Sequence, residues 1–69
     1  MINISFGDRL KDLREEKQIG QVELAKEIGV SKGVISLWEN QLREPGMTSL
    51  IKIANFFNVS IDYLVGREL

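Results

Sequence analysis

The chain has 69 residues, of which nine are Lys or Arg and ten are Asp or Glu, with a net charge of −1 and neither His nor Cys. This length fits one domain, and the missing His and Cys exclude zinc fingers, disulfides and thiol nucleophiles. We expect no metal, no cofactor and no enzymatic activity. We also expect a cytoplasmic protein, because no apolar run approaches the roughly 18 residues that span a bilayer.

Four helix-breaking residues divide the chain into five short segments: Gly20, Gly29, Pro45 and Asn58. The first segment is predicted to be a helix that begins after the N-cap Ser5, because apolar residues recur there at helical spacing between charged ones. The second, residues 21–28, is predicted to stop at Gly29, since glycine readily adopts the left-handed conformation that ends helices.

Three more helices are predicted after this point. Ser31 is a good N-cap, and the helix behind it would turn Ile35 and Trp38 inward. The next helix is expected over residues 47–57, and Ser60 would cap a last short one. Because β-branched residues nowhere alternate for more than a few positions, the pattern indicates an all-α chain.

The stretch 21–40 has the pattern of a helix, a tight turn and a second helix. Ala25 is small where the two helices would cross, Gly29 permits the turn, and Ile35 and Trp38 would lock the second helix against the first. The other side of the second helix then faces outward, as a helix that enters a major groove must. From spacing alone, a plain packing unit of two helices explains the pattern equally well.

These residues resemble the helix-turn-helix of the Cro and phage-repressor family, the XRE-like transcriptional regulators. The shared positions are Gln21, Leu24, Ala25, the turn Gly29-Val30-Ser31, Ile35, Ser36, Glu39, Asn40, Pro45, Leu50, Ile53, Ala54 and the closing Tyr63-Leu64-Val65-Gly66. The resemblance covers nearly the whole chain. It implies a compact, five-helix, lambda-repressor-like DNA-binding domain over residues 1–69, with the helix-turn-helix at about 21–40 and its second helix as the recognition helix.

The resemblance places four residues toward the bases: Lys32, Gly33, Ser36 and Leu37. Lys32 can donate to O6 and N7 of guanine. Leu37 stands where relatives often carry a long polar or basic residue, and it can offer only an apolar contact, which suits a thymine methyl group. Gly33 has no side chain to read a base. We therefore expect Lys32, Ser36 and DNA shape to carry more of the specificity.

Phosphate contacts are expected from Gln21, Lys26, Ser31, Val34 and Arg43. The resemblance implies that Gln21 holds a phosphate through its amide and the neighbouring N–H groups of a helix N-terminus, so Gln21→Ala should weaken all DNA sites alike; alternatively, Gln21 is only a solvent-exposed polar residue. Arg43 stands alone where the family typically has two basic residues. Residues 21–46 contain three cations and four carboxylates, which is little positive charge for a DNA-facing surface.

Two further roles follow from the resemblance. Arg14 should pair with Glu39, as a structural bridge that orients the recognition helix. Phe56, Tyr63 and Val65 are the expected dimer interface, because Phe56 and Tyr63 fall off the predicted core stripes in the half through which family members dimerise. The alternative is that these residues merely complete a small core.

We therefore expect a sequence-specific regulator of transcription, acting as a repressor, that binds double-stranded DNA at an inverted-repeat operator as a homodimer. The alternative function is a protein-interaction module, antitoxin-like or an anti-repressor, which would use the fold and the apolar region of Leu37, Leu42 and Ile51. Salt dependence separates the two, because binding to several phosphates must weaken steeply as salt rises.

Overall fold

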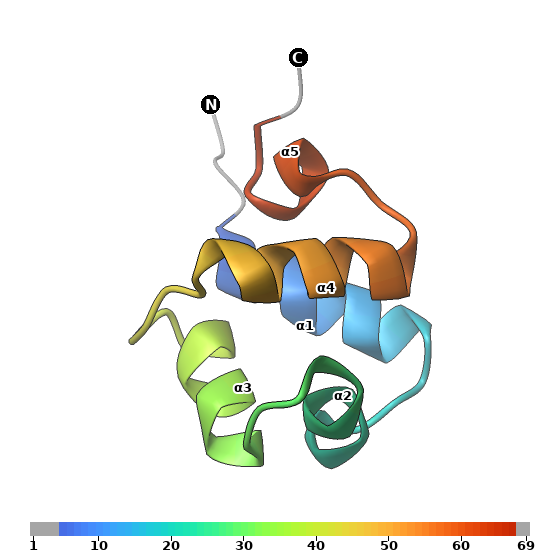
Figure 1. Cartoon of the computed structure of the whole chain (residues 1–69), viewed down its shortest axis with the longest axis vertical. Helices are drawn as coiled ribbons and strands as arrows, with labels where there is room; N and C mark the ends of the chain where they lie inside the picture. The colour runs from blue at the N-terminus through green and yellow to red at the C-terminus, as the bar shows by residue number, and fades with distance from the viewer. Residues whose placement is uncertain (1–4, 68–69) are drawn as a thin grey trace.

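The computed structural model describes residues 5–67, and these residues form five α-helices and no strand (Figure 1). In chain order the helices are α1 (Phe6–Glu16), α2 (Gln21–Ile28), α3 (Lys32–Glu39), α4 (Met47–Phe57) and α5 (Ile61–Leu64). Figure 1 shows α2 and α3 together at one end of the molecule and α5 at the other, with α1 and α4 between them. The predicted all-α class with five helices is confirmed.

Serine side chains begin three of the helices, as the sequence predicts. The hydroxyl oxygens of Ser5, Ser31 and Ser60 accept hydrogen bonds from backbone N–H groups three residues later, at 3.2, 3.2 and 3.0 Å. Gly20 and Gly46 hold the corresponding positions before α2 and α4, and neither has a side chain to cap the helix. The first N–H groups of α2 and α4 therefore remain available to a ligand.

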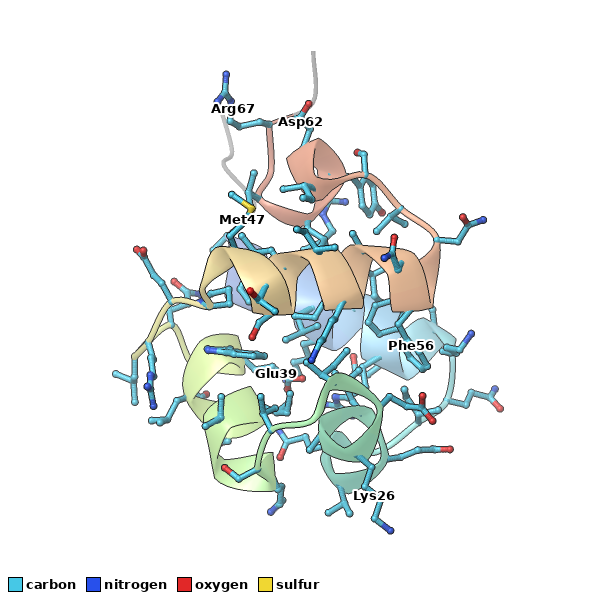
Figure 2. The ribbon with its side chains drawn as sticks, in the orientation of Figure 1. Lys26, Glu39, Met47, Phe56, Asp62 and Arg67 are labelled. Carbon is cyan, nitrogen blue, oxygen red and sulfur yellow. The ribbon has the colours of Figure 1, made fainter. Side chains whose placement is uncertain are left out.

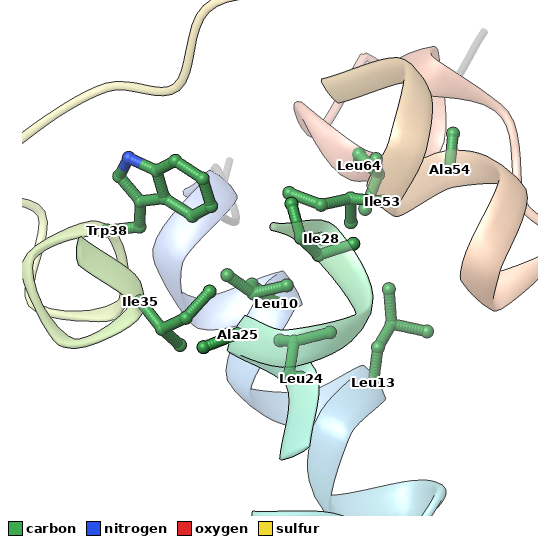
Figure 3. Packing of buried hydrophobic residues seen from close by; sticks show 10 residues of the cluster. All are labelled: Leu10, Leu13, Leu24, Ala25, Ile28, Ile35, Trp38, Ile53, Ala54 and Leu64. Carbon is green, nitrogen blue, oxygen red and sulfur yellow. The ribbon is translucent and has the colours of Figure 1, made fainter. Parts of the chain in front are cut away.

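A single cluster of buried apolar residues joins all five helices (Figure 3). Its members are Leu10, Leu13, Leu24, Ala25, Ile28, Ile35, Trp38, Ile53, Ala54 and Leu64. Phe6, Leu50 and Phe57 are only half-buried at its rim. Phe6 packs edge-on against Trp38, with ring centroids 6.2 Å apart, and so joins the start of α1 to the end of α3.

Gly7 lets α1 approach the end of α3 more closely than any other residue would allow. A Cβ atom added there would lie 2.8 Å from the carbonyl oxygen of Glu39 and closer still to the carbonyl oxygen of Trp38. Both neighbours are backbone atoms that cannot rotate away. Gly7 is therefore a packing requirement of the α1–α3 contact, which the sequence pattern does not reveal.

Phe56 and Tyr63 are both half-buried and pack against the buried cluster, which favours the alternative that they complete a small core. Phe56 also makes an edge-to-face contact with Phe57 at 4.9 Å and lies beneath the Lys17 ammonium group. The Arg9 guanidinium lies 3.9 Å from the centre of the Tyr63 ring. The cationic side chains of Arg9 in α1 and of Lys17, which follows α1, therefore cover part of the surface that was assigned to a dimer interface.

Val65, the third residue assigned to that interface, is half-buried at the end of α5. The largest exposed apolar side chains lie elsewhere. Among residues 5–67 they are Leu42, Met47, Val22, Ile51 and Leu37, in order of decreasing exposure. Within residues 5–67, no helix combines the length and the apolar character that crossing a membrane requires.

Candidate nucleic-acid interface

The predicted helix-turn-helix is formed by α2, α3 and the turn between them. Gly29 ends α2 with φ of 82°, and both its N–H and that of Val30 donate to the Ala25 carbonyl, at 2.8 and 3.0 Å. Ile35 and Trp38 are buried against α2 and α1, which fixes the inner side of α3. The opposite side of α3 is left facing solvent.

That outer side carries the four residues predicted to face bases, and the structure brings them together on one face of α3. Lys32 and Gly33 are exposed in its first turn, and Leu37, 36% exposed, lies one turn further on. Ser36 is half-buried, and its hydroxyl oxygen accepts a hydrogen bond from Asn40 Nδ2 at 3.3 Å. Around Gly33 the space is open, since a Cβ there would find only Ser31 Oγ, at 3.8 Å.

The residues predicted to contact phosphates divide into two groups. Lys26 and Arg43 are exposed, and Lys26 extends from α2 away from the body of the molecule (Figure 2). Ser31 and Val34 instead serve α3 itself: the Val34 N–H donates to Ser31 Oγ, and the Val34 side chain packs against the core. The backbone N–H of Val34 is thus already engaged in the helix cap.

Glu39, the last residue of α3, holds three helices together. It is the one charged side chain buried among the described residues, and Figure 2 shows it on the inner side of α3. Arg14 of α1 donates to both of its carboxylate oxygens, from Nε at 2.8 Å and from Nη2 at 3.1 Å. The implied Arg14–Glu39 pair is therefore present in the structure.

The same network reaches the start of α2. Arg14 Nη1 donates to the Ile19 carbonyl at 3.0 Å, just before α2 begins, and Gln21 Nε2 donates to Glu39 Oε1 at 3.0 Å. The hydrogen bonds to Glu39 raise the pKa of Arg14 above its usual range, although burial acts in the opposite direction. The link between Gln21 and Glu39 joins residues 18 positions apart, and sequence reasoning missed it.

The charge of the outer face is more favourable than the count over residues 21–46 indicates. Because Arg14 pairs with Glu39, that carboxylate does not oppose an approaching anion. The remaining charges are three cations and three carboxylates: Lys26, Lys32, Arg43, Glu23, Glu27 and Glu44. The uncapped N-terminus of α4, whose first turn contains no acidic residue, adds a partial positive charge that sequence reasoning also missed.

This surface has no arrangement that indicates metal chemistry. Within the described part of the chain, no group of three or more His, Cys, Asp and Glu could hold a metal ion. What the surface offers is an exposed helix with one ammonium group, a gap at Gly33 and an apolar side chain, together with two helix N-termini and two further cations. Such a set of groups suits a polyanion that also presents hydrogen-bond acceptors and apolar groups on the edges of its bases.

Comparison with known sequences finds transcriptional regulators among the relatives of this chain. A helix-turn-helix family model matches residues 10–64. The transcriptional regulator ImmR of Bacillus subtilis (strain 168) is 35% identical over 65 residues, which are 94% of this chain and 51% of ImmR. The transcriptional activator BcrR of Enterococcus faecalis is 40% identical over 65 residues, again 94% of this chain but 32% of BcrR. The chain thus spans about half of ImmR and about a third of BcrR.

Among solved structures, the fold is similar to a repressor captured on DNA. The c2 repressor of phage P22, crystallised in complex with the synthetic operator 9T, matches with a TM-score of 0.88 and 32% sequence identity. The match covers 94% of this chain and 98% of that one. The full course of the five helices, and not only the α2–α3 unit, is therefore shared with that repressor.

Proposed function

Because this chain belongs to the helix-turn-helix family, we propose that it is a transcriptional regulator that binds double-stranded DNA sequence-specifically through α3. The observation that carries the proposal is the outward face of α3, held rigid from behind by buried Ile35 and Trp38 and by the ion pair at Glu39. A short exposed helix supported in this way can enter a major groove without rearrangement. The P22 repressor–operator complex supports this assignment.

Base reading is proposed for Lys32, Gly33, Ser36 and Leu37. Lys32 donates to the O6 and N7 acceptors of guanine, and Leu37 contacts a thymine methyl group. Gly33 contributes by leaving space, since nothing but Ser31 Oγ lies within 4 Å of a Cβ at that position. The helix backbone can then approach the floor of the groove closely.

Phosphate binding is proposed for Gln21, Lys26, Arg43 and the uncapped N-termini of α2 and α4. Helix N-termini attract anions because their first N–H groups are unpaired and the helix dipole is positive there. Ser31 is also in this set, because its hydroxyl oxygen accepts the cap bond while its O–H can still donate to a phosphate, whereas the backbone N–H of Val34 is already engaged in that cap. These contacts supply affinity and register, whereas the α3 face supplies discrimination.

The proposed biological outcome is repression, as in the P22 relative, whose name is that of a repressor. A domain bound at an operator blocks polymerase by its position, and such a role requires no catalysis, metal or cofactor. We further propose that residues 1–69 act as one DNA-binding domain in the cytoplasm. Selection from a pool of random duplexes tests this assignment, since the proposal predicts enrichment of one sequence and a chain without DNA-reading function enriches none.

We propose that the chain binds its operator as a homodimer. A twofold pair would place two α3 helices about 34 Å apart on one face of the DNA, so the selected sequence should be an inverted repeat. Phe56, Tyr63 and Val65 remain the proposed interface, although the first two already pack on the core of their own chain. Analytical ultracentrifugation tests this directly, and a monomer at high concentration both with and without operator would exclude the dimer.

Lys32→Ala is expected to lower affinity for the selected operator about tenfold and to relax the preference at a single guanine, because a specific base contact is worth about 1–3 kcal/mol. Binding to random duplexes should fall much less. The matched control is Lys11→Ala, which removes the same charge from an exposed position on α1. Fluorescence anisotropy with both duplexes measures the effect, and equal losses on operator and random DNA would show that Lys32 reads no base.

A second function is favoured by one observation, the exposure of Leu42, Met47 and Ile51, which are 74%, 64% and 45% accessible. Apolar side chains exposed to this extent suit contact with another protein. The two functions predict different behaviour in salt, because an apolar contact does not release counterions. If the chain enriches no DNA sequence but binds another protein at high salt, the second function is favoured over DNA recognition.

A further inference from the structure

The side-chain amide of Gln21 has a fixed orientation in the folded chain. Glu39 accepts hydrogen bonds at both carboxylate oxygens and donates none, so the Nε2 group of Gln21, not its oxygen, must face it. The distance from Nε2 to Glu39 Oε1 is 3.0 Å. One N–H is used in this bond, and the second N–H of the same nitrogen is directed away from it.

Gln21 is also the first residue of α2, at the uncapped N-terminus where we placed a phosphate. We infer that Gln21 is a positioning residue: its amide donates one N–H to the DNA phosphate and the other to Glu39, so that the phosphate contact fixes the seat of α3 in the groove. The inference rests on the proposed function and adds a role to it. It differs from the expectation, stated above, that Gln21 acts on all DNA alike.

The physical basis is the place of Glu39 at the end of the reading helix. Arg14 anchors Glu39 to α1 and, through the Ile19 carbonyl, to the segment that enters α2. Gln21 supplies the direct link from α2 to that carboxylate. Without it, α2 and α3 keep their apolar contact, but the phosphate-binding end of α2 is no longer hydrogen-bonded to α3. Small shifts of α3 relative to the phosphates then weaken the contacts of Lys32 and Leu37 with the bases.

The test compares Gln21→Met with Lys26→Met. Gln21→Met keeps the length of the side chain but removes both N–H donors. Lys26→Met removes a proposed phosphate contact on α2, and in the described structure Lys26 has no hydrogen bond to Glu39. Affinities are measured by anisotropy for the selected operator and for a random duplex. We expect Gln21→Met to weaken the operator about tenfold more than the random duplex, and Lys26→Met to weaken both by one common factor.

A double-variant cycle adds a second readout. If Gln21 seats α3, then Lys32→Ala should cost the operator complex less in the Gln21→Met background than in the unmodified chain, because the base contact has already been weakened. Additive losses together with equal factors on both duplexes would overturn the inference and leave Gln21 as an ordinary phosphate contact.

Melting of Gln21→Met and Gln21→Ala is recorded before binding is measured. Midpoints below the assay temperature for both variants would overturn the inference, since Gln21 would then be required for folding and not for positioning. The failure of the proposed function looks different: the unmodified chain itself would not distinguish its selected duplex from a random one, whatever the behaviour of the variants.

Discussion

Arg14→Ala is expected to lower the free energy of unfolding by about 3–5 kcal/mol, because it leaves the buried Glu39 carboxylate without its cationic partner. The side chains of Arg14 and Glu39 are only 13% and 4% exposed, so water cannot replace the lost hydrogen bonds. A native domain has a total free energy of unfolding of about 5–15 kcal/mol, so this loss removes a large fraction of the stability. The hydrogen bond from Gln21 remains in the variant, but a neutral donor cannot balance the negative charge of the Glu39 carboxylate.

Urea denaturation followed by the fluorescence of Trp38, which is the single tryptophan, measures this change. Arg43→Ala is the matched control, because Arg43 is exposed and should alter stability by less than about 0.5 kcal/mol. Equal midpoints for the two variants would mean that the buried pair does not stabilise the fold. Glu39 raises the pKa of Arg14, so the stabilisation by its charge is complete below the ordinary arginine pKa and is lost only as pH rises through the raised value. Stability should therefore not fall on its account at mildly alkaline pH.

Gly7→Ala should destabilise the fold by about 2 kcal/mol, whereas Gly33→Ala should stabilise it by about 0.5–1 kcal/mol. Both glycines are in helices, so alanine gains the same helical preference at each site. At Gly7, however, the new methyl group meets the backbone oxygens of Trp38 and Glu39, and α1 must move away from α3. At Gly33 the methyl group meets open space.

The same urea titration measures this pair of variants, and opposite signs are the result that the packing requires. Similar stabilities for the two variants would show that α1 and α3 do not approach as closely as the structure has them. Gly33→Ala should also lower operator affinity, because its methyl group occupies the space where the helix meets the bases. A stable variant that binds poorly would separate the folding requirement at Gly7 from the recognition requirement at Gly33.

Much of the fold is predictable because its determinants are local. Ser5, Ser31 and Ser60 cap helices where the sequence places them, and Gly29 takes the left-handed conformation that the turn needs. Ile35 and Trp38, which helical spacing predicts to turn inward, are both buried. The resemblance to the Cro and phage-repressor family is confirmed by the family match over residues 10–64.

The failures concern contacts between distant segments. Phe56 and Tyr63 lie off the apolar stripes of their own helices, but Arg9 of α1, Lys17 just after it and the adjoining core cover them once the chain is folded. The hydrogen bond from Gln21 to Glu39 depends on how α2 crosses α3, and no local pattern encodes that crossing. The tight fit at Gly7 depends likewise on the end of α3, more than 30 positions away. The assignments of the DNA-facing residues stay predictions until binding is measured.

The most direct test of the central claim, that α3 reads DNA, is the affinity for the selected duplex and for a shuffled one across a salt series. The two exposed cations assigned to phosphates, Lys26 and Arg43, predict that the logarithm of the binding constant falls against the logarithm of salt with a slope of about −2 for each bound copy. The selected duplex should remain the tighter one at every salt concentration. Equal affinities for the two duplexes, or a slope near zero, would contradict DNA reading by α3.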